Sequence, residues 1–175
     1  MHQAIITTKL AGARLLNGGN DIMTLSPLQL HRYFVEEISC KANTDFDKDK
    51  DIKVKDFQVF FETAEDKNPL LRRIRLTITQ NLSKDGNEPF AFKIVMVGFF
   101  EVMKEFFESH EPEKTEQLVT VNGPALLYSA ARELLAIVSG RGPFPDVNMH
   151  ILLPSITFLQ FKPMKQSSKQ KRDKQ

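Results

Sequence analysis

The sequence contains few of the residues on which catalysis, metal binding or disulfide formation usually depends. It has a single cysteine, Cys40, so no disulfide can form within the chain. The four histidines, His2, His31, His110 and His150, are not spaced from one another or from Cys40 as zinc ligands are. No GxGxxG motif, phosphate-binding loop or GxSxG motif is present. We therefore expect a protein that is not an enzyme and that uses no metal and no cofactor.

Tryptophan and long apolar segments are also missing, whereas phenylalanine is abundant. The chain has no Trp and only two Tyr but fourteen Phe, which supply aromatic bulk without a polar group. The most apolar window, residues 90–103, is interrupted by Lys93, Gly98 and Glu101 and is too short to cross a bilayer. The N-terminus lacks the basic and then apolar pattern of a secretory signal. These features predict a cytoplasmic protein with no membrane partner.

The charge is distributed unevenly along the 175 residues. The net charge is +2, but the last fourteen residues hold six basic side chains and one acidic side chain. We expect an N-terminal extension over residues 1–27, one folded domain over residues 28–161 and a basic disordered tail over residues 162–175. The tail is interpreted as a solubilising end, with contact to acidic partners or nucleic acid as the alternative. It has no interleaved aromatic residues for base stacking, so nucleic acid is not the expected partner.

Alternating apolar and polar residues predict four β-strands. The alternation covers residues 28–40, 57–62, 74–79 and 90–97. The run from Val35 to Glu37 interrupts the first pattern and predicts a bulge or bend. In the fourth segment both sets of alternate residues are largely apolar, so we expect something to cover each face of that strand.

Helical spacing dominates the sequence after the fourth strand. Residues 101–110 form a short amphipathic segment, which Pro112 separates from another at residues 114–120. A longer helix is predicted to begin at Pro124, a favourable first helical position, and to end at Gly140 and Gly142 before Pro143. Four strands followed by helices predict an α+β fold, in which helices pack on one face of a four-stranded antiparallel sheet.

Four aspartates alternate with other residues in the segment between the first two strands. Asp45, Asp47, Asp49 and Asp51 superficially suggest a calcium loop. Such a loop needs a glycine at its sixth position and a glutamate at its twelfth, and this segment supplies neither. We expect a solvated loop without a metal.

The predicted long helix and the residues after it resemble the SecB family of export chaperones. An apolar helix carrying Ala131-Arg132-Glu133 is followed by a defined series of residues, namely Arg141, Gly142, Phe144, Pro145 and Asn148. The resemblance covers residues 28–161. It implies a homotetramer, built as a dimer of dimers, that holds unfolded polypeptide without ATP and serves protein export and transport.

The resemblance, together with the apolar fourth strand and the proline-bounded segment after the helix, identifies candidate client-binding residues. They are Phe90, Phe92, Ile94, Met96, Phe99, Phe100, Phe144, Val147, Met149 and Leu152. Core or subunit-interface packing is the alternative interpretation of each one. In the family, an acidic face of the sheet docks the motor protein SecA, and the matching positions here are Glu37, Lys41 and Lys93. Because two of the three are lysines, we do not expect strong docking to SecA.

The sequence thus predicts a SecB-like holdase in protein export or in the protection of an antitoxin. The basic tail and the altered docking positions favour the solitary or toxin-antitoxin-linked chaperones of this kind. The alternative is an interaction module that uses the same fold to bind one specific protein or peptide.

Overall fold

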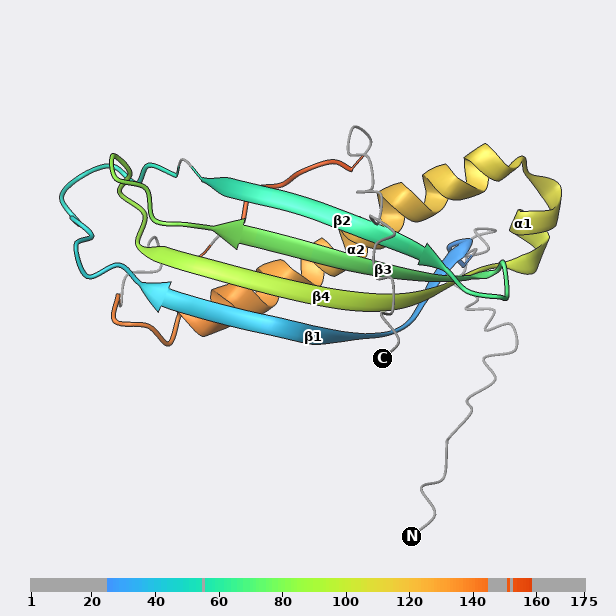
Figure 1. Ribbon diagram of the computed structural model, residues 1–175, viewed down its shortest axis with the longest axis horizontal. Coiled ribbons are helices and arrows are strands. Elements are labelled where there is room, and N and C mark those ends of the chain that lie inside the picture. The colour runs from blue at the N-terminus through green and yellow to red at the C-terminus, as the bar shows by residue number, and fades with distance from the viewer. Residues whose placement is uncertain (1–24, 55, 145–150, 152, 159–175) are drawn as a thin grey trace, which may run out of the picture.

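The computed structural model describes residues 25–54, 56–144, 151 and 153–158, which form an α+β fold of four strands and two helices. The strands are β1 (Leu28–Ala42), β2 (Phe57–Glu65), β3 (Leu71–Gln80) and β4 (Phe90–Val102), and the helices are α1 (Lys104–Ser109) and α2 (Pro112–Ser139) (Figure 1). The predicted fold class is confirmed.

The four strands form one antiparallel sheet in the order β1-β4-β3-β2, which leaves β1 and β2 at its edges. The register of β1 against β4 shifts between Val35 and Glu37, where the sequence predicts a bulge, and also between Leu30 and Arg32. Each shift exchanges which set of alternate residues faces the helix. Both bulges therefore decide which β1 side chains face the helix.

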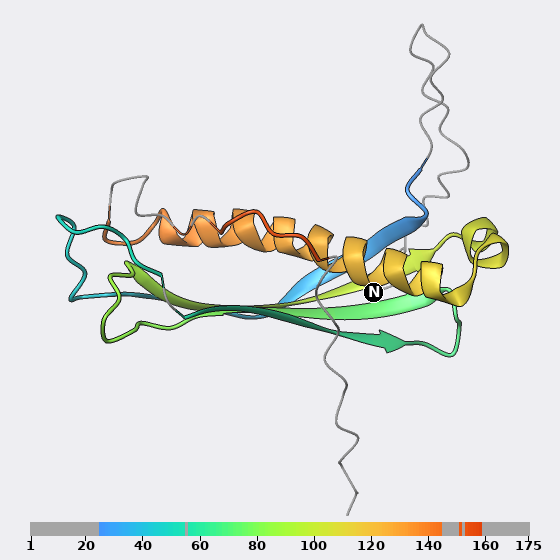
Figure 2. The same ribbon diagram turned by 90° about the horizontal axis from the view of Figure 1, so that it is seen from above.

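Helix α2 lies across one face of the sheet, and in the part of the chain that the structure describes no helix lies on the opposite face (Figure 2). We call these the helix face and the open face. The core lies between α2 and the sheet, where Leu127, Ala131 and Leu135 contribute fully buried side chains. Gly123 allows a close approach, because a Cβ atom there would lie 2.1 Å from Cδ1 of Ile74 on β3.

The long helix differs from the sequence prediction at its start. It begins at Pro112, so the segment 114–120 and the segment after Pro124 form one continuous helix with Pro124 inside it. Thr115 and Val119 are buried on the same stripe as Leu127, and this packing outweighs the cost of an internal proline. Gly140 ends the helix with φ −64°, so it does not adopt a left-handed conformation there.

The segment after the helix returns along the β2 side of α2 (Figure 1). The Tyr128 hydroxyl donates a hydrogen bond of 2.8 Å to the Pro154 carbonyl. The Phe158 ring lies 5.9 Å from the rings of both Phe61 and Tyr128. Burial raises the pKa of Tyr128, which keeps the phenol protonated as a donor. This segment closes the core between α2 and β2.

Candidate functional site

Exposed apolar side chains occur on β1 and on α2, two elements that pack against each other. On β1 they are Tyr33, Val35 and Ile38, and on α2 they are Leu126, Ile137 and Val138, all between 36% and 56% exposed. We call these six residues the β1–α2 strip. After the bulges, the register places the three β1 residues on the helix face. Leu126 and Ile137 share the flank of α2 opposite to Tyr128.

The strip is exposed because the two sides of α2 are filled differently. On the β2 side, Ile151, Leu153 and Phe158 are buried against the core. On the β1 side, no other described segment covers the strip. Within the strip region, burial raises the pKa of the Cys40 thiol, so Cys40 acts there as a small, protonated apolar residue.

Strand β1 is also one of the two free edges of the sheet. β1 is fifteen residues long and pairs with β4 alone. An edge strand of this length offers backbone donors and acceptors to another strand. The β1–α2 strip and the β1 edge together can bind a second polypeptide, either a sister copy or a client.

A second set of exposed apolar residues lies in the connections at the end of the sheet where β2 begins and β3 ends. Ile52 and Val54 precede β2, and Leu82 follows β3, with exposures of 45%, 49% and 39%. A backbone hydrogen bond from Asn81 to Asp56 extends the β2–β3 pairing toward them. We call these three residues the loop cluster. The sequence analysis missed them, although the alternation Ile-Lys-Val-Lys at residues 52–55 is a signal of an apolar side within a charged loop.

Five of the predicted client-binding residues are in the core. Phe90, Phe92, Ile94, Met96 and Phe100 are at most 4% exposed and lie between the sheet and α2. The expectation that these side chains form an exposed groove is wrong for the subunit. They project from β4 toward the helix, and β4 is a central strand, so α2 covers them.

The other five candidates have different positions. Phe99 projects from β4 onto the open face and is only partly buried. Phe144 is partly buried between two aromatic rings, 5.2 Å from Phe46 and 5.3 Å from Phe90, and closes one end of the core. Val147, Met149 and Leu152 lie outside the described residues.

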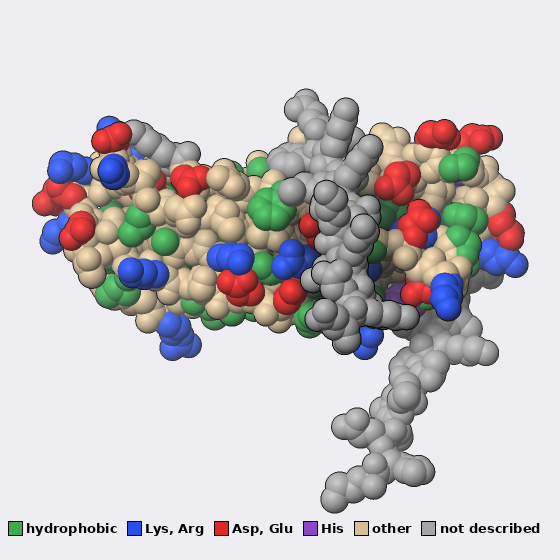
Figure 3. All heavy atoms as spheres, in the orientation of Figure 1, with side chains coloured by type: hydrophobic (Ala, Val, Ile, Leu, Met, Phe, Trp, Pro, Cys, Tyr) green, Lys and Arg blue, Asp and Glu red, His purple; other side chains and the backbone are tan. Residues whose placement is uncertain are grey.

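The predicted motor-docking positions lie on the open face, which carries both signs of charge (Figure 3). Lys93 and Glu37 form an ion pair of 2.7 Å between Nζ and Oε2. Lys41 is exposed near the end of β1. Arg75 and Glu36 form a second ion pair of 2.8 Å, which lowers the pKa of Glu36 and raises that of Arg75. The open face is therefore not uniformly acidic.

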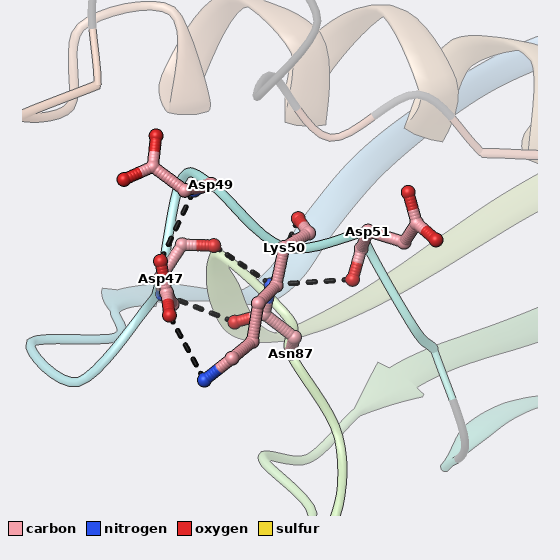
Figure 4. A network of polar contacts seen from close by, with 5 residues as sticks. All are labelled: Asp47, Asp49, Lys50, Asp51 and Asn87. Carbon is pink, nitrogen blue, oxygen red and sulfur yellow. Dashed lines mark hydrogen bonds and ion pairs between the residues drawn. The ribbon is translucent and has the colours of Figure 1, made fainter.

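The aspartate-rich loop is organised by hydrogen bonds (Figure 4). The Asn87 side-chain amide donates to the carbonyls of Asp47, Lys50 and Asp51, and its oxygen accepts from the Asp47 backbone. The Asp47 carboxylate accepts from the Asp49 backbone and pairs with Lys50 at 2.9 Å, and these contacts lower its pKa. In the described part of the chain, no group of three or more His, Cys, Asp or Glu side chains could hold a metal ion.

Comparison with known proteins gives a match at the level of the fold. No family model matches the chain, and no curated protein matches it by sequence. The structure is similar to the SecB-like chaperone Rv1957 of Mycobacterium tuberculosis, solved in complex with a ChAD peptide from the Rv1956 HigA1 antitoxin. The TM-score is 0.51 and the identity 15%, over 74% of this chain and 90% of that one.

A protein of unknown function from Streptococcus agalactiae is also similar over 65% of this chain and 87% of that one, with a TM-score of 0.35 and 16% identity. The match to Rv1957 shows that the chain has a SecB-like α+β fold. Of the helices in the described residues, none is both long and apolar enough to cross a membrane.

Proposed function

We propose that this protein is an ATP-independent chaperone, not an enzyme, that holds non-native polypeptide in the cytoplasm. The observation that carries the proposal is the large apolar surface that the folded subunit leaves exposed, in the β1–α2 strip and in the loop cluster. Large apolar patches on a soluble protein mark binding surfaces for other proteins. The similarity to a SecB-like chaperone that was solved with an antitoxin peptide supports the same class of partner.

The β1–α2 strip is assigned to assembly. Strand β1 is a long edge, and two copies related by a two-fold axis can pair their β1 edges while burying Tyr33, Val35 and Ile38. The exposed α2 residues of the strip can then meet those of further copies. The expected assembly is a homotetramer, a dimer of dimers.

The loop cluster is assigned to the client. Ile52 and Val54 lie in a segment without regular secondary structure, which can adapt to different side chains. Each client side chain buried there contributes about 1.5–3 kcal/mol before the cost of ordering the chain. Four copies of such a weak site give avidity without sequence specificity.

Antitoxin protection is the more specific role that we favour over export. The neighbour of similar fold was solved with an antitoxin peptide, and the open face of this chain carries lysines at two of the three predicted SecA-docking positions. Docking to SecA and general protein transport are therefore the less favoured route. Neither a membrane nor a nucleic acid is needed as a partner.

The function is tested with the full-length protein and an unrelated client. Guanidinium-unfolded citrate synthase is diluted into buffer without ATP, and its aggregation is followed by light scattering. We expect the wild-type chain to suppress scattering, and the variant Ile52→Ser/Val54→Ser/Leu82→Ser to lose at least half of that suppression. Leu25→Ser, which alters an exposed leucine outside the cluster, should suppress like wild type. A wild-type chain that protects only one specific partner would instead support the interaction-module alternative.

Assembly is tested separately by size-exclusion chromatography with light scattering. The variant Ile38→Glu/Ile137→Glu places charges in the β1–α2 strip and should reduce the mass to that of a smaller species. Ile52→Glu, in the loop cluster, should leave the mass unchanged. A wild-type protein that is already monomeric would contradict the assignment of the strip to assembly.

A further inference from the structure

The open face of the sheet contains one row of residues that differs from the rows beside it. The register places Arg32, Phe99, Arg73 and Ala64 opposite one another on β1, β4, β3 and β2. Two arginines thus flank one phenylalanine, and the small Ala64 side chain ends the row. A hollow of about 580 Å³ opens here, and its lining also includes His31, Leu71 and the carboxylates Glu65 and Asp66.

The cations of the open face differ in their pairing, and the two arginines of this row, like the exposed Lys41, form no ion pair among the described residues. Arg75 pairs with Glu36, and Lys93 pairs with Glu37. Among the described residues, neither Arg32 nor Arg73 has a carboxylate within ion-pair distance. The Arg32 guanidinium lies 4.7 Å from the centre of the Phe99 ring, which holds it over the face and leaves its edge donors free.

The carboxylates near the hollow are already engaged. Glu101 contacts His31 at 2.7 Å, and Glu65 lies 3.6 Å from the buried Arg72. The Asp66 carboxylate accepts a hydrogen bond from the Asn68 backbone. The lining of the hollow thus holds three arginines, Arg32, Arg72 and Arg73, against two carboxylates, Glu65 and Asp66, which leaves a formal charge of +1.

Exposed aromatic surface adjoins the arginines. The Phe34 ring is 6.1 Å from the Phe99 ring, and Phe34 is 48% exposed. Aromatic residues and arginine together are the side chains that most often provide the binding energy at protein interfaces. Such a surface suits a ligand that brings carboxylates to the arginines and an apolar side chain to the rings.

We propose that the hollow at Arg32, Phe99 and Arg73 binds an acidic polypeptide segment of another protein, at a site separate from the loop cluster that is assigned to the client. Arg32 and Arg73 are two strands apart, so a segment with carboxylates roughly 10 Å apart and an apolar residue between them fits the row. Each arginine can hold one carboxylate with paired N–H donors.

The ends of this chain do not have the chemistry of that ligand. Residues 1–24 contain Lys9 and Arg14 against Asp21, and residues 162–175 are strongly basic. A nucleic acid fits the face less well than a peptide, because Arg75 and Lys93 are paired with Glu36 and Glu37, and the cations of the face therefore form no continuous series for successive phosphates. The occupant is therefore a short acidic and apolar segment of a different chain.

The experiment uses a fluorescein-labelled peptide in which glutamates flank a Leu-Phe pair, and a matched peptide with lysine in place of each glutamate. Fluorescence anisotropy with the full-length protein should show binding of the acidic peptide at least tenfold tighter than that of the basic peptide. The variant Arg32→Glu/Arg73→Glu should weaken acidic-peptide binding by about 10- to 100-fold, as expected for the loss of two charge-assisted contacts.

The controls separate this site from general holding of apolar chains. Arg132→Glu changes an exposed arginine on α2 and should leave peptide binding unchanged. Arg32→Gln/Arg73→Gln provides a neutral pair if the charge reversal prevents folding, and it should also weaken binding at least fivefold. Both arginine variants should still suppress aggregation of citrate synthase. Equal binding of the two peptides, unchanged binding by the arginine variants, or tighter arginine-dependent binding of a twenty-nucleotide oligothymidylate would overturn the proposal.

Discussion

The two faces of the sheet are covered by different means, although both contain apolar residues. On the helix face, α2 buries Ile74, Ile94 and Leu127 completely. On the open face, Val95 is 0% and Thr77 3% exposed, although neither of the two described helices lies above them. Their row lies between the rows of Arg75 and Lys93, whose long side chains form ion pairs with Glu36 and Glu37.

This difference shows what can shield a central strand. The aliphatic stems of long charged side chains can cover small apolar residues and keep their charges in water. These charged side chains do not cover the row of Phe99, where the hollow opens. The helix face thus stabilises the subunit, whereas the open face combines a modest stability role with a binding surface.

Adjacent residues on β4 test the comparison most directly. Phe100 is 1% exposed beneath α2, and Phe99 projects from the open face. We expect Phe100→Ala to lower the free energy of unfolding by about 3–5 kcal/mol through loss of buried area and cavity formation. Phe99→Ala, the matched control in the next position, should cost less than about 1.5 kcal/mol. Urea unfolding followed by circular dichroism measures both, and equal losses would mean that the two faces are buried alike.

The close approach of α2 to the sheet gives a prediction of intermediate size. In Gly123→Ala the new Cβ meets Cδ1 of Ile74 at 2.1 Å, and we expect a loss of about 1 kcal/mol after the gain in helix propensity. Ile74→Val removes that Cδ1 atom and should reduce the cost of Gly123→Ala by at least about 0.5 kcal/mol in a double-mutant cycle. Additive losses in the double variant would show that the helix does not rest on the sheet at this point.

Much of the fold could be predicted from the sequence because local patterns agree with tertiary packing there. The alternation in residues 74–79 predicts β3, and the irregular run at Val35–Glu37 predicts the bulge that the register shows. The start of the long helix could not be predicted, because Pro124 carries a strong local signal for a first turn. The buried residues Thr115 and Val119, which extend the helix past it, are recognised only against the sheet.

The candidate site could be predicted less well, because its residues come together only in the folded chain. The two apolar sets on β4 do not show which one the helix covers, so the sequence predicts an exposed groove that includes Phe92 and Ile94, which α2 in fact buries. The exposed residues Ile38 and Ile137 come from segments a hundred residues apart, and only the fold brings β1 and α2 together. The row of Arg32 and Phe99 depends on the register shift after Leu30, which has no clear signal in the sequence.

The hydrogen bond that anchors the segment 151–158 gives a smaller effect on the helix face. Tyr128→Phe removes the donor to the Pro154 carbonyl and should cost about 0.5–1.5 kcal/mol, toward the lower end because Pro154 is exposed. Thermal unfolding measures the loss. The matched change Tyr33→Phe, on the exposed strip, should be nearly neutral, and an equal loss at both positions would mean that this bond does not hold the segment.

The smallest expected effect concerns the ion pairs on the open face and their dependence on pH. The hydrogen bond from Arg75 lowers the pKa of Glu36, so this pair stabilises the fold at pH values above the ordinary glutamate pKa of about 4.3. As the pH falls through the lowered pKa of folded Glu36, the stabilisation disappears. The urea midpoint of Glu36→Gln should therefore lie slightly below that of wild type at pH 7 and approach it as the pH falls below the ordinary glutamate pKa, whereas Glu133→Gln on α2 should show no such convergence. A difference that persists unchanged to pH 3 would mean that Glu36 contributes through packing and not through its charge, and the cover of the open face would then not depend on ion pairing.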